Sequence, residues 1–259
     1  MIGAIIGDIV GSVYEFNNHK NKDFLLFSDK SHVTDDTIMT LAVYDIIKSG
    51  YINDRSLIID TFKKWGRLYP NVGYGKRFYN FIMSDEALPY NSYGNGSAMR
   101  VSPCGILGKT EEEVKAYTYN VTSVTHSHPD ALLGAEVVSM CIFYAKNNKS
   151  KDFIRDYVKK YYDLNYDYLD LVKNYTFDIT CKGSVPVAIY CFLISNSFID
   201  CLRTTVSIGG DTDTLCAISC SIAYVFYKEN YDDLIEEVLK RIPYGIAKTK
   251  FKEMLEEEK

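Results

Sequence analysis

The chain runs Ser207-Ile208-Gly209-Gly210-Asp211-Thr212-Asp213-Thr214 and then enters an apolar segment, residues 215–227, that predicts a buried helix. Two carboxylates and two hydroxyls therefore stand directly after a glycine pair, at the start of this helix. Carboxylates two residues apart in a turn can converge on one point, and hard oxygen ligands of this kind suit Mg²⁺ or Mn²⁺. Asp and Thr are also preferred helix N-caps, so Asp211 or Asp213 could simply cap the helix.

A second cluster of the same kind, Thr34-Asp35-Asp36, stands before apolar residues with helical spacing over 38–47. Neighbouring carboxylates repel one another unless a cation neutralises them. Glu15, which follows the N-terminal segment, raises the number of available carboxylates to five. Five are enough for a pair of metal ions that share a bridging carboxylate. The second cluster therefore favours metal binding over capping alone for residues 207–214.

The N-terminal segment, residues 2–14, carries Gly3, Gly7 and Gly11 at intervals of four. On a helix these glycines form one smooth stripe, which allows a neighbouring helix to approach closely. Their spacing does not fit the G-x-G-x-x-G fingerprint of dinucleotide-binding proteins. The segment is apolar, as a signal peptide is, but it lacks a basic start and Asp8 interrupts it, so we expect it to be part of the fold.

The composition bounds the class of protein. A length of 259 residues with 47 % apolar side chains predicts a single domain over residues 1–259. The net charge of −5 and the dispersed lysines argue against groove-type nucleic-acid binding, which we do not expect. Apolar runs fall short of the roughly eighteen residues of a membrane span. The seven cysteines contain no Cys-x-x-Cys pair and predict buried thiols in a reducing compartment, hence a cytoplasmic protein.

Helical spacing continues through most of the chain. It predicts helices over residues 54–65, 111–125, 129–146, 151–162, 187–195, 198–208, 232–241 and 247–256. Residues 183–186 are predicted to lead into the helix over 187–195 without being part of it. Loops are predicted over residues 20–30, 70–75 and 89–100, where charged residues or turn formers gather. Because strand-like alternation is scarce, we predict an all-α fold.

Five motifs follow one another along the chain. They are Gly7-Asp8 with Gly11-Ser12 and Glu15; Thr34-Asp35-Asp36-Thr37; Gly94-Asn95-Gly96-Ser97-Ala98-Met99-Arg100; Thr125-His126-Ser127-His128-Pro129; and Gly209-Gly210-Asp211-Thr212-Asp213-Thr214. Each is weak alone, but together and in this order they resemble the ADP-ribosylglycohydrolase family. The resemblance implies a compact orthogonal multi-helix bundle and hydrolysis of the bond between ribose C1″ of ADP-ribose and an acceptor.

The resemblance also implies a centre of two Mg²⁺ or Mn²⁺ ions held by oxygen side chains: Thr34, Asp35 and Asp36 for one ion, and Asp211, Asp213 and Thr214 for the second ion and the bridge. Glu15 matches a family glutamate at the edge of this centre. It would be a ligand in one state and would position the substrate or water in another. The implied catalytic residues are Glu15, Asp35, Asp36 and Asp213.

The residues implied to bind the substrate are Tyr93, Gly94, Asn95, Gly96, Ser97, Met99, His126, Gly209 and Gly210. The segment 94–97 fits a diphosphate because small residues expose backbone N–H groups to an anion, and a plain tight turn is the alternative. Tyr93 or Tyr90 could stack on the adenine, although an aromatic side chain beside glycines is as often packing. A neutral His126 could donate to phosphate or ribose, and a structural histidine is the alternative.

Several alternatives stay open at the level of sequence. Arginine, serine, poly(ADP-ribose) and nucleic acid bases all fit as the ADP-ribosylated partner, because the metal motifs do not separate them. A non-catalytic ADP-ribose-binding or structural family member is a rival, as is a metal-dependent nucleotide phosphohydrolase, since two metals can also bridge a phosphate. Residues 146–180 carry no family motif.

Overall fold

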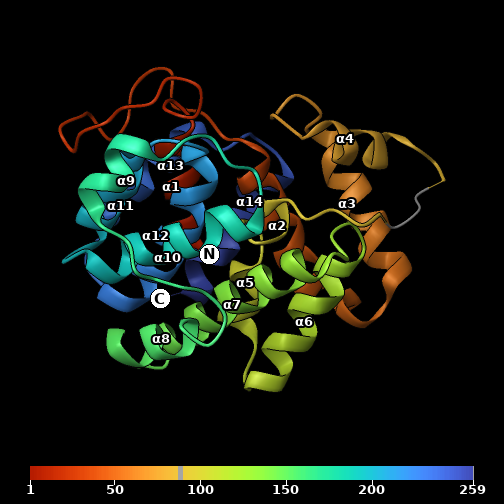
Figure 1. Cartoon of the computed structure of the whole chain (residues 1–259). Coiled ribbons are helices and arrows are strands. Elements are labelled where there is room, and N and C mark those ends of the chain that lie inside the picture. The colour runs from red at the N-terminus through yellow and green to blue at the C-terminus, as the bar shows by residue number, and fades with distance from the viewer. Residues whose placement is uncertain (87–89, 259) are drawn as a thin grey trace.

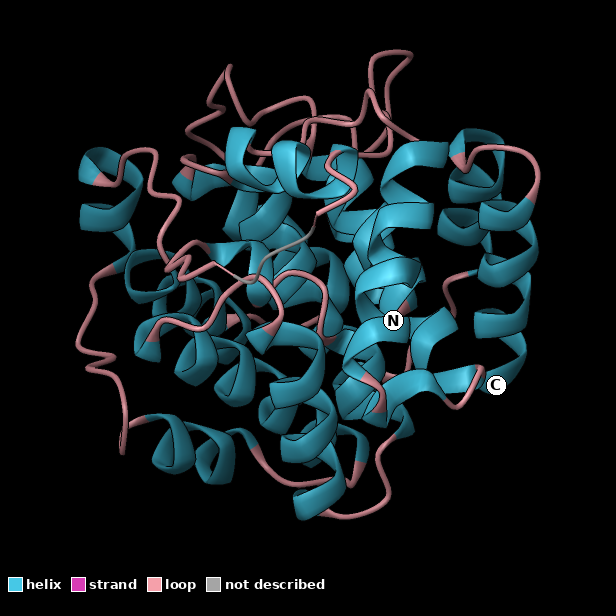
Figure 2. Cartoon of the chain, turned by 90° about the vertical axis from the view of Figure 1, so that its right-hand side faces the viewer, coloured by secondary structure: helices cyan, strands magenta, loops and turns pink. Residues whose placement is uncertain are grey.

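The computed structural model describes residues 1–86 and 90–258, and every regular element within them is a helix (Figures 1 and 2). The α-helices are α1 (Ile2–Gly11), α2 (Asp35–Lys48), α3 (Arg55–Leu68), α4 (Lys76–Met83), α5 (Ser102–Leu107), α6 (Glu111–Ser123), α7 (Pro129–Lys146), α8 (Lys151–Val158), α9 (Tyr168–Asn174), α10 (Cys181–Ile194), α11 (Phe198–Ile208), α12 (Thr212–Tyr227), α13 (Asp232–Arg241) and α14 (Ile246–Glu257). Two 3₁₀ turns, η1 (Tyr51–Asn53) and η2 (Asn95–Ser97), complete the set. The all-α prediction is confirmed.

Three of the predicted helices, α7, α11 and α13, begin and end at the predicted residues. The predicted lead-in over 183–186 is wrong, because the Thr180 side chain accepts from the Gly183 amide at 3.0 Å and starts α10 at Cys181. Pro186 consequently lies inside the helix. The short helices α4, α5 and α9 were not predicted, since a helix of six to eight residues gives too few turns for a clear period. Pro89, at the start of the predicted loop 89–100, lies outside the described residues.

Helices α1 and α12 run against each other through the centre of the molecule (Figure 1). All ten residues of α1 are buried. A Cβ atom on Gly3, Gly7 or Gly11 would lie within 2.5 Å of a carbonyl oxygen of α12, those of Cys220, Cys216 and Thr212 respectively. The predicted glycine stripe is therefore a line of backbone-to-backbone contact, and it holds the start of α12 beside the end of α1.

We expect Gly7→Ala to destabilise the protein. Alanine has the better helix propensity by about 1 kcal/mol, but its methyl group would overlap the Cys216 carbonyl, which is backbone and cannot rotate away. Forcing the helices apart should therefore give a net loss of about 2 kcal/mol or more in the free energy of unfolding. Urea denaturation measures it. Gly75→Ala is the control, because a Cβ there meets no atom within 4 Å; equal midpoints for the two variants would contradict the close contact.

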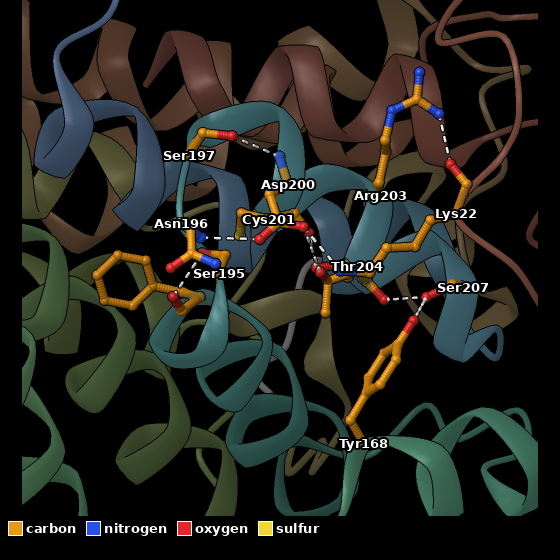
Figure 3. Close-up of polar contacts among 12 residues, drawn as sticks. Lys22, Tyr168, Ser195, Asn196, Ser197, Asp200, Cys201, Arg203, Thr204 and Ser207 are labelled. Carbon is orange, nitrogen blue, oxygen red and sulfur yellow. Dashed lines mark hydrogen bonds and ion pairs between the residues drawn. The ribbon is translucent and has the colours of Figure 1, made fainter.

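The connection between α1 and α2 arches over the top of Figure 1 and is fastened to α11 (Figure 3). Lys22 Nζ pairs with Asp200 Oδ1 at 2.8 Å, and Arg203 Nη1 donates to the Lys22 carbonyl at 2.6 Å. On the same helix, Ser207 Oγ lies 2.7 Å from the Tyr168 hydroxyl of α9. These contacts hold α11 along its length up to Ser207, close to the point where the chain enters the Gly209–Gly210 turn.

All seven cysteines are buried, as predicted, and they are free. In residues 1–86 and 90–258, none of the helices combines the length and apolar character needed to cross a bilayer.

Candidate active site

A cavity of about 410 Å³ brings the predicted clusters together. Its lining residues come from seven segments of the chain. Six of them contribute Glu15 after α1, Asp35 and Asp36 of α2, Lys76 and Arg77 of α4, seven residues between Tyr90 and Arg100, His126, and Asp211, Asp213 and Thr214 at the start of α12. Phe177 and Ile179 complete its rim from the connection before α10. Carboxylates line one part of this wall, while the cations and His126 come from other segments.

The glycine pair before α12 makes the turn that presents the carboxylates. Gly209 and Gly210 have φ angles of +74° and +82°, in the left-handed region that L side chains rarely adopt. Asp211 occupies the N-cap position of α12, but its side chain caps no amide. Its Oδ2 instead accepts from Asn95 Nδ2 at 2.6 Å. The capping interpretation of this residue is therefore wrong, and the carboxylate is directed into the cavity wall.

The oxygen-bearing side chains at the start of α2 have two different roles. Thr34 caps the helix by accepting from the Asp36 amide at 3.2 Å and donates its hydroxyl proton to Asp8 Oδ1 at 2.7 Å. It is buried and does not line the cavity. Asp35 and Asp36 do line it, and the Thr214 hydroxyl donates to Asp36 Oδ2 at 3.3 Å. The Asp35–Asp36 pair thus faces the carboxylates of α12, while Thr34 supports the helix behind them.

Two carboxylate oxygens in this cluster, Asp36 Oδ1 and Asp213 Oδ1, are buried with no hydrogen-bond partner among the described residues. Buried acceptors are nearly always satisfied, so orphaned carboxylate oxygens beside other carboxylates are suited to binding a cation. Glu15, Asp211 and Asp213 each offer an oxygen, and these three atoms lie within 4.8 Å of one another. This donor set of hard, anionic oxygens fits a divalent cation.

The electrostatics of the cluster agree with its geometry. Burial, followed by the neighbouring carboxylates Asp213 and Asp8, raises the pKa of Glu15 to about 8. Burial raises the pKa of Asp211 to about 6 and holds the pKa values of Asp36 and Asp213 well above their usual range, and nearby carboxylates add to each shift. Without a cation the cluster therefore binds protons at neutral pH, which neutralises part of the repulsion.

A model of the ADP-ribosylglycohydrolase family matches residues 1–254. The chain belongs to the ADP-ribosylglycohydrolase family. Similar curated proteins include ADP-ribosylhydrolase ARH3 of Homo sapiens, 25% identical over 88% of this chain and 84% of that protein. ADP-ribosyl-[dinitrogen reductase] glycohydrolase of Rhodospirillum rubrum is 23% identical over 95% of this chain and 90% of that protein.

A solved ADP-ribosylglycohydrolase-related protein complex contains a chain of the same fold. The two superpose with a TM-score of 0.69 over 97% of this chain and 95% of that chain, at 18% identity. This match confirms the predicted all-helical fold of the ADP-ribosylglycohydrolase type. The family is typically metal-dependent, and the acidic group of Glu15, Asp211 and Asp213 is where this member could hold a metal.

The substrate-binding residues predicted for this ADP-ribosylglycohydrolase family member fall into two groups. Gly94, Asn95, Gly96, Met99 and His126 line the cavity. The Gly94 and Asn95 amides are already engaged, with Ser92 Oγ at 3.1 Å and the Ile179 carbonyl at 2.8 Å. Segment 94–97 therefore has fewer free N–H groups for an anion than its glycines suggest.

The remaining predicted residues lie outside the wall of the cavity. Ser97 is fully buried and its hydroxyl donates to the Ala131 carbonyl at 3.2 Å. Tyr93 is half-exposed and packs edge-on against His128, with ring centroids 5.8 Å apart. Gly209 and Gly210 are covered by Asn18 and Tyr175. Their predicted roles as substrate contacts stay predictions.

Asp8 has a structural role that sequence reasoning did not assign. It is fully buried in α1 and accepts from the amide and the hydroxyl of both Thr34 and Thr37. Four donors on one carboxylate fasten the start of α2 to α1 and so hold Asp35 and Asp36 in place. A lone aspartate inside an apolar helix is the signal that could have revealed it, because such a charge is buried only with partners.

The cations of the cavity, Lys76, Arg77 and Arg100, were also not predicted as site residues. Arg77 lies over the Tyr90 ring, 4.9 Å from its centroid. Arg100 is 1% exposed and lies over Phe62, 4.5 Å from its centroid. The pair Lys76-Arg77 after the glycine-rich loop 70–75 was the available signal. The resulting cavity has carboxylates and cations on its wall, which suits a ligand with an anionic part and a part that meets a metal ion.

Proposed function

We propose that the protein is a divalent-metal-dependent hydrolase that removes ADP-ribose from a modified acceptor by cleaving the glycosidic bond at ribose C1″. The observation that carries this proposal is the pair of orphaned carboxylate oxygens, Asp36 Oδ1 and Asp213 Oδ1, in a cavity that also holds Arg77, Arg100 and His126. The carboxylates suit a metal ion and a ribose, and the donors suit a diphosphate. Family membership supports the same reaction class.

In this proposal Glu15, Asp211 and Asp213 would hold one Mg²⁺ or Mn²⁺, and Asp35, Asp36 and Thr214 would serve a second. Thr34 is better placed as a helix cap than as a ligand, since its hydroxyl is committed to Asp8. A bound divalent cation supplies neutralisation of the carboxylates and a lower pKa for a coordinated water.

The protein's own side chains would bind the substrate, accept a proton and stabilise the transition state. Carboxylates on one face of the ribose stabilise the positive charge that develops at C1″ as the bond breaks. Glu15, half-buried at the edge of the cavity, can accept a proton from a water on that face through a carboxylate oxygen. His126 and the cations would bind the diphosphate, and the half-exposed Tyr93 would offer a ring to the adenine. The buried free cysteines support the proposal of a cytoplasmic location.

The test is product analysis on a panel of arginine-, serine- and nucleic-acid-linked ADP-ribose and poly(ADP-ribose), with Mg²⁺, with Mn²⁺ and with EDTA. We expect free ADP-ribose from at least one substrate, in the presence of metal only. Release of AMP or inorganic phosphate would instead identify a phosphohydrolase. Binding of ADP-ribose without cleavage of any member of the panel would identify a non-catalytic binding protein.

A further inference from the structure

A chain of hydrogen bonds connects Arg100, Thr125 and His126 in the wall of the cavity. Arg100 Nη2 donates to Thr125 Oγ1 at 2.8 Å and to the Val121 carbonyl at 2.9 Å. Thr125 Oγ1 in turn lies 2.8 Å from His126 Nδ1. All three side chains are buried, with exposed fractions of 1%, 0% and 6%. At such burial no water competes for the Arg100–Thr125 and Thr125–His126 contacts. The proton of each contact is therefore donated by one of these side chains and accepted by another.

The direction of the protons follows from the donors and acceptors that meet at Thr125 Oγ1. Thr125 Oγ1 accepts from Arg100, which leaves the single hydroxyl proton to be donated. His126 Nδ1 is an acceptor within reach, so the hydroxyl donates to Nδ1 and the imidazole carries its proton on Nε2. In the opposite arrangement Nδ1–H would donate to Thr125, and the buried hydroxyl proton would lose its acceptor. An unsatisfied buried donor is costly enough to make that arrangement a minor one.

The Nε2 atom faces the glycine segment of the cavity. A Cβ atom would lie 3.3 Å from Nε2 if built on Gly96 and 3.8 Å if built on Gly94. None of the described residues accepts a hydrogen bond from Nε2. Burial holds the pKa of His126 well below its usual range, and Arg100 and Arg77 act in the same direction. The ring is therefore neutral, with one free N–H beside the two glycines.

Arg100 makes the same region electropositive. It forms no ion pair within residues 1–86 and 90–258, and its Nε has no acceptor there. Burial lowers its pKa only to about 10, so it stays charged at neutral pH. A buried cation without a carboxylate partner is stabilised by an anionic ligand in the adjoining cavity. The Nε2–H donor of His126 and the positive charge of Arg100 therefore both favour an anionic group in the cavity.

We propose that Arg100 and Thr125 are positioning residues that fix His126 as the neutral Nε2–H tautomer and aim this donor at the diphosphate of an ADP-ribosyl ligand lying against Gly94 and Gly96. The proposal rests on the proposed function for the identity of the ligand. The tautomer itself does not depend on that function.

The first measurement is ¹⁵N NMR of the histidine rings in the metal-free, ligand-free protein, with the His126 signals assigned by their loss in His126→Gln. We expect Nδ1 to resonate as an unprotonated nitrogen and Nε2 as a protonated one. Thr125→Val removes the hydroxyl at nearly constant shape and should release the ring to a mixture of tautomers. Thr125→Ser keeps the hydroxyl and should preserve the wild-type pattern. Protonation at Nδ1 in the wild type would overturn the proposal.

The second measurement is ADP-ribose affinity by calorimetry. Loss of a fixed donor to a charged group should weaken binding by roughly ten- to a hundredfold in Thr125→Val, with recovery in Thr125→Ser. Thr122→Val is the matched control, because the Thr122 hydroxyl is equally buried on α6 but has no hydrogen-bond partner. It should change neither readout, and thermal unfolding confirms that each variant is folded.

The outcomes separate the two proposals. Wild-type affinity in a folded Thr125→Val variant would contradict the role of Thr125 in positioning His126. A wild-type protein that binds no ADP-ribose would contradict the proposed function and the proposed ligand of His126, while the NMR pattern would still decide whether Arg100 and Thr125 set the tautomer.

Discussion

Asp213→Asn is expected to abolish turnover and, in the same protein, to raise the stability of the metal-free form. Asp213 is 4% exposed, its Oδ1 has no partner, and its oxygens share the metal-ligand group with Glu15 and Asp211. Removing one anionic ligand should lower kcat/KM by roughly a thousandfold or more, since the loss of supporting contacts alone costs up to about a hundredfold. The neutral amide also removes repulsion from the carboxylate cluster, which should raise Tm in EDTA.

The two expected effects have opposite signs, because turnover falls while the Tm of the metal-free form rises. A merely structural aspartate would lose stability and activity together. Asp233→Asn makes the same chemical change at an exposed position of α13 and should alter neither turnover nor Tm. Turnover of an ADP-ribosylated substrate by Asp213→Asn at the wild-type rate would refute the assignment of this residue.

The free energy of unfolding of the metal-free protein should fall as the pH rises from 7 to 8.5, and Mg²⁺ or Mn²⁺ should reverse this fall. The raised pKa values of about 8 for Glu15 and about 6 for Asp211 mean that the folded protein binds protons which the unfolded chain, with values near 4, has released. Stability from these groups is complete below pH 4 and is lost as the pH rises through 6 and then 8. The lowered pKa of His126 gives a slope of the opposite sign, but that slope is small above pH 7 because the unfolded histidine, with a pKa near 6.5, is already mostly neutral there.

A divalent cation takes the place of those protons, so its effect should grow with pH. At a hundredfold excess over Kd it would stabilise the folded state by about 2.7 kcal/mol, which is roughly 5–10 °C in Tm for a chain of this size. Thermal unfolding in EDTA, MgCl₂ and MnCl₂ at each pH measures this, with NaCl at equal ionic strength as the control for screening. A metal-free stability that is flat or rising between pH 7 and 8.5, or an equal gain from NaCl, would argue against a metal centre.

Local sequence was sufficient for most helices, because caps and apolar periodicity are properties of neighbouring residues. Thr34, Asp54, Thr110, Ser150 and Ser197 all cap the helices that follow them. The short helices α4, α5 and α9 escaped prediction because tertiary packing stabilises them and their period is too brief to detect. The prediction of a single domain over residues 1–259 stays a prediction.

The site was only partly predictable for a different reason. The composition of residues 34–36 and 211–214 predicted that carboxylates would gather, and they line one cavity. Which oxygens remain free depends on contacts between distant segments. The Thr34 hydroxyl donates to Asp8, and Asp211 accepts from Asn95. Asp36 and Asp213 each keep one carboxylate oxygen without a partner. Asp8, Lys76 and Arg77 carry local signals, but the partners that give them and Arg100 their roles come from distant segments.

The sequence by itself determined the longer helices, the glycine stripe of α1 and the two oxygen clusters, because each depends on spacing along the chain. Only the tertiary structure decided that the stripe lies on the α12 backbone, that Thr34 supports the site from behind, and that Arg100 reaches His126 through Thr125. Hydrogen-bond partners compete for each donor and acceptor, and that competition is settled in three dimensions between residues far apart in sequence.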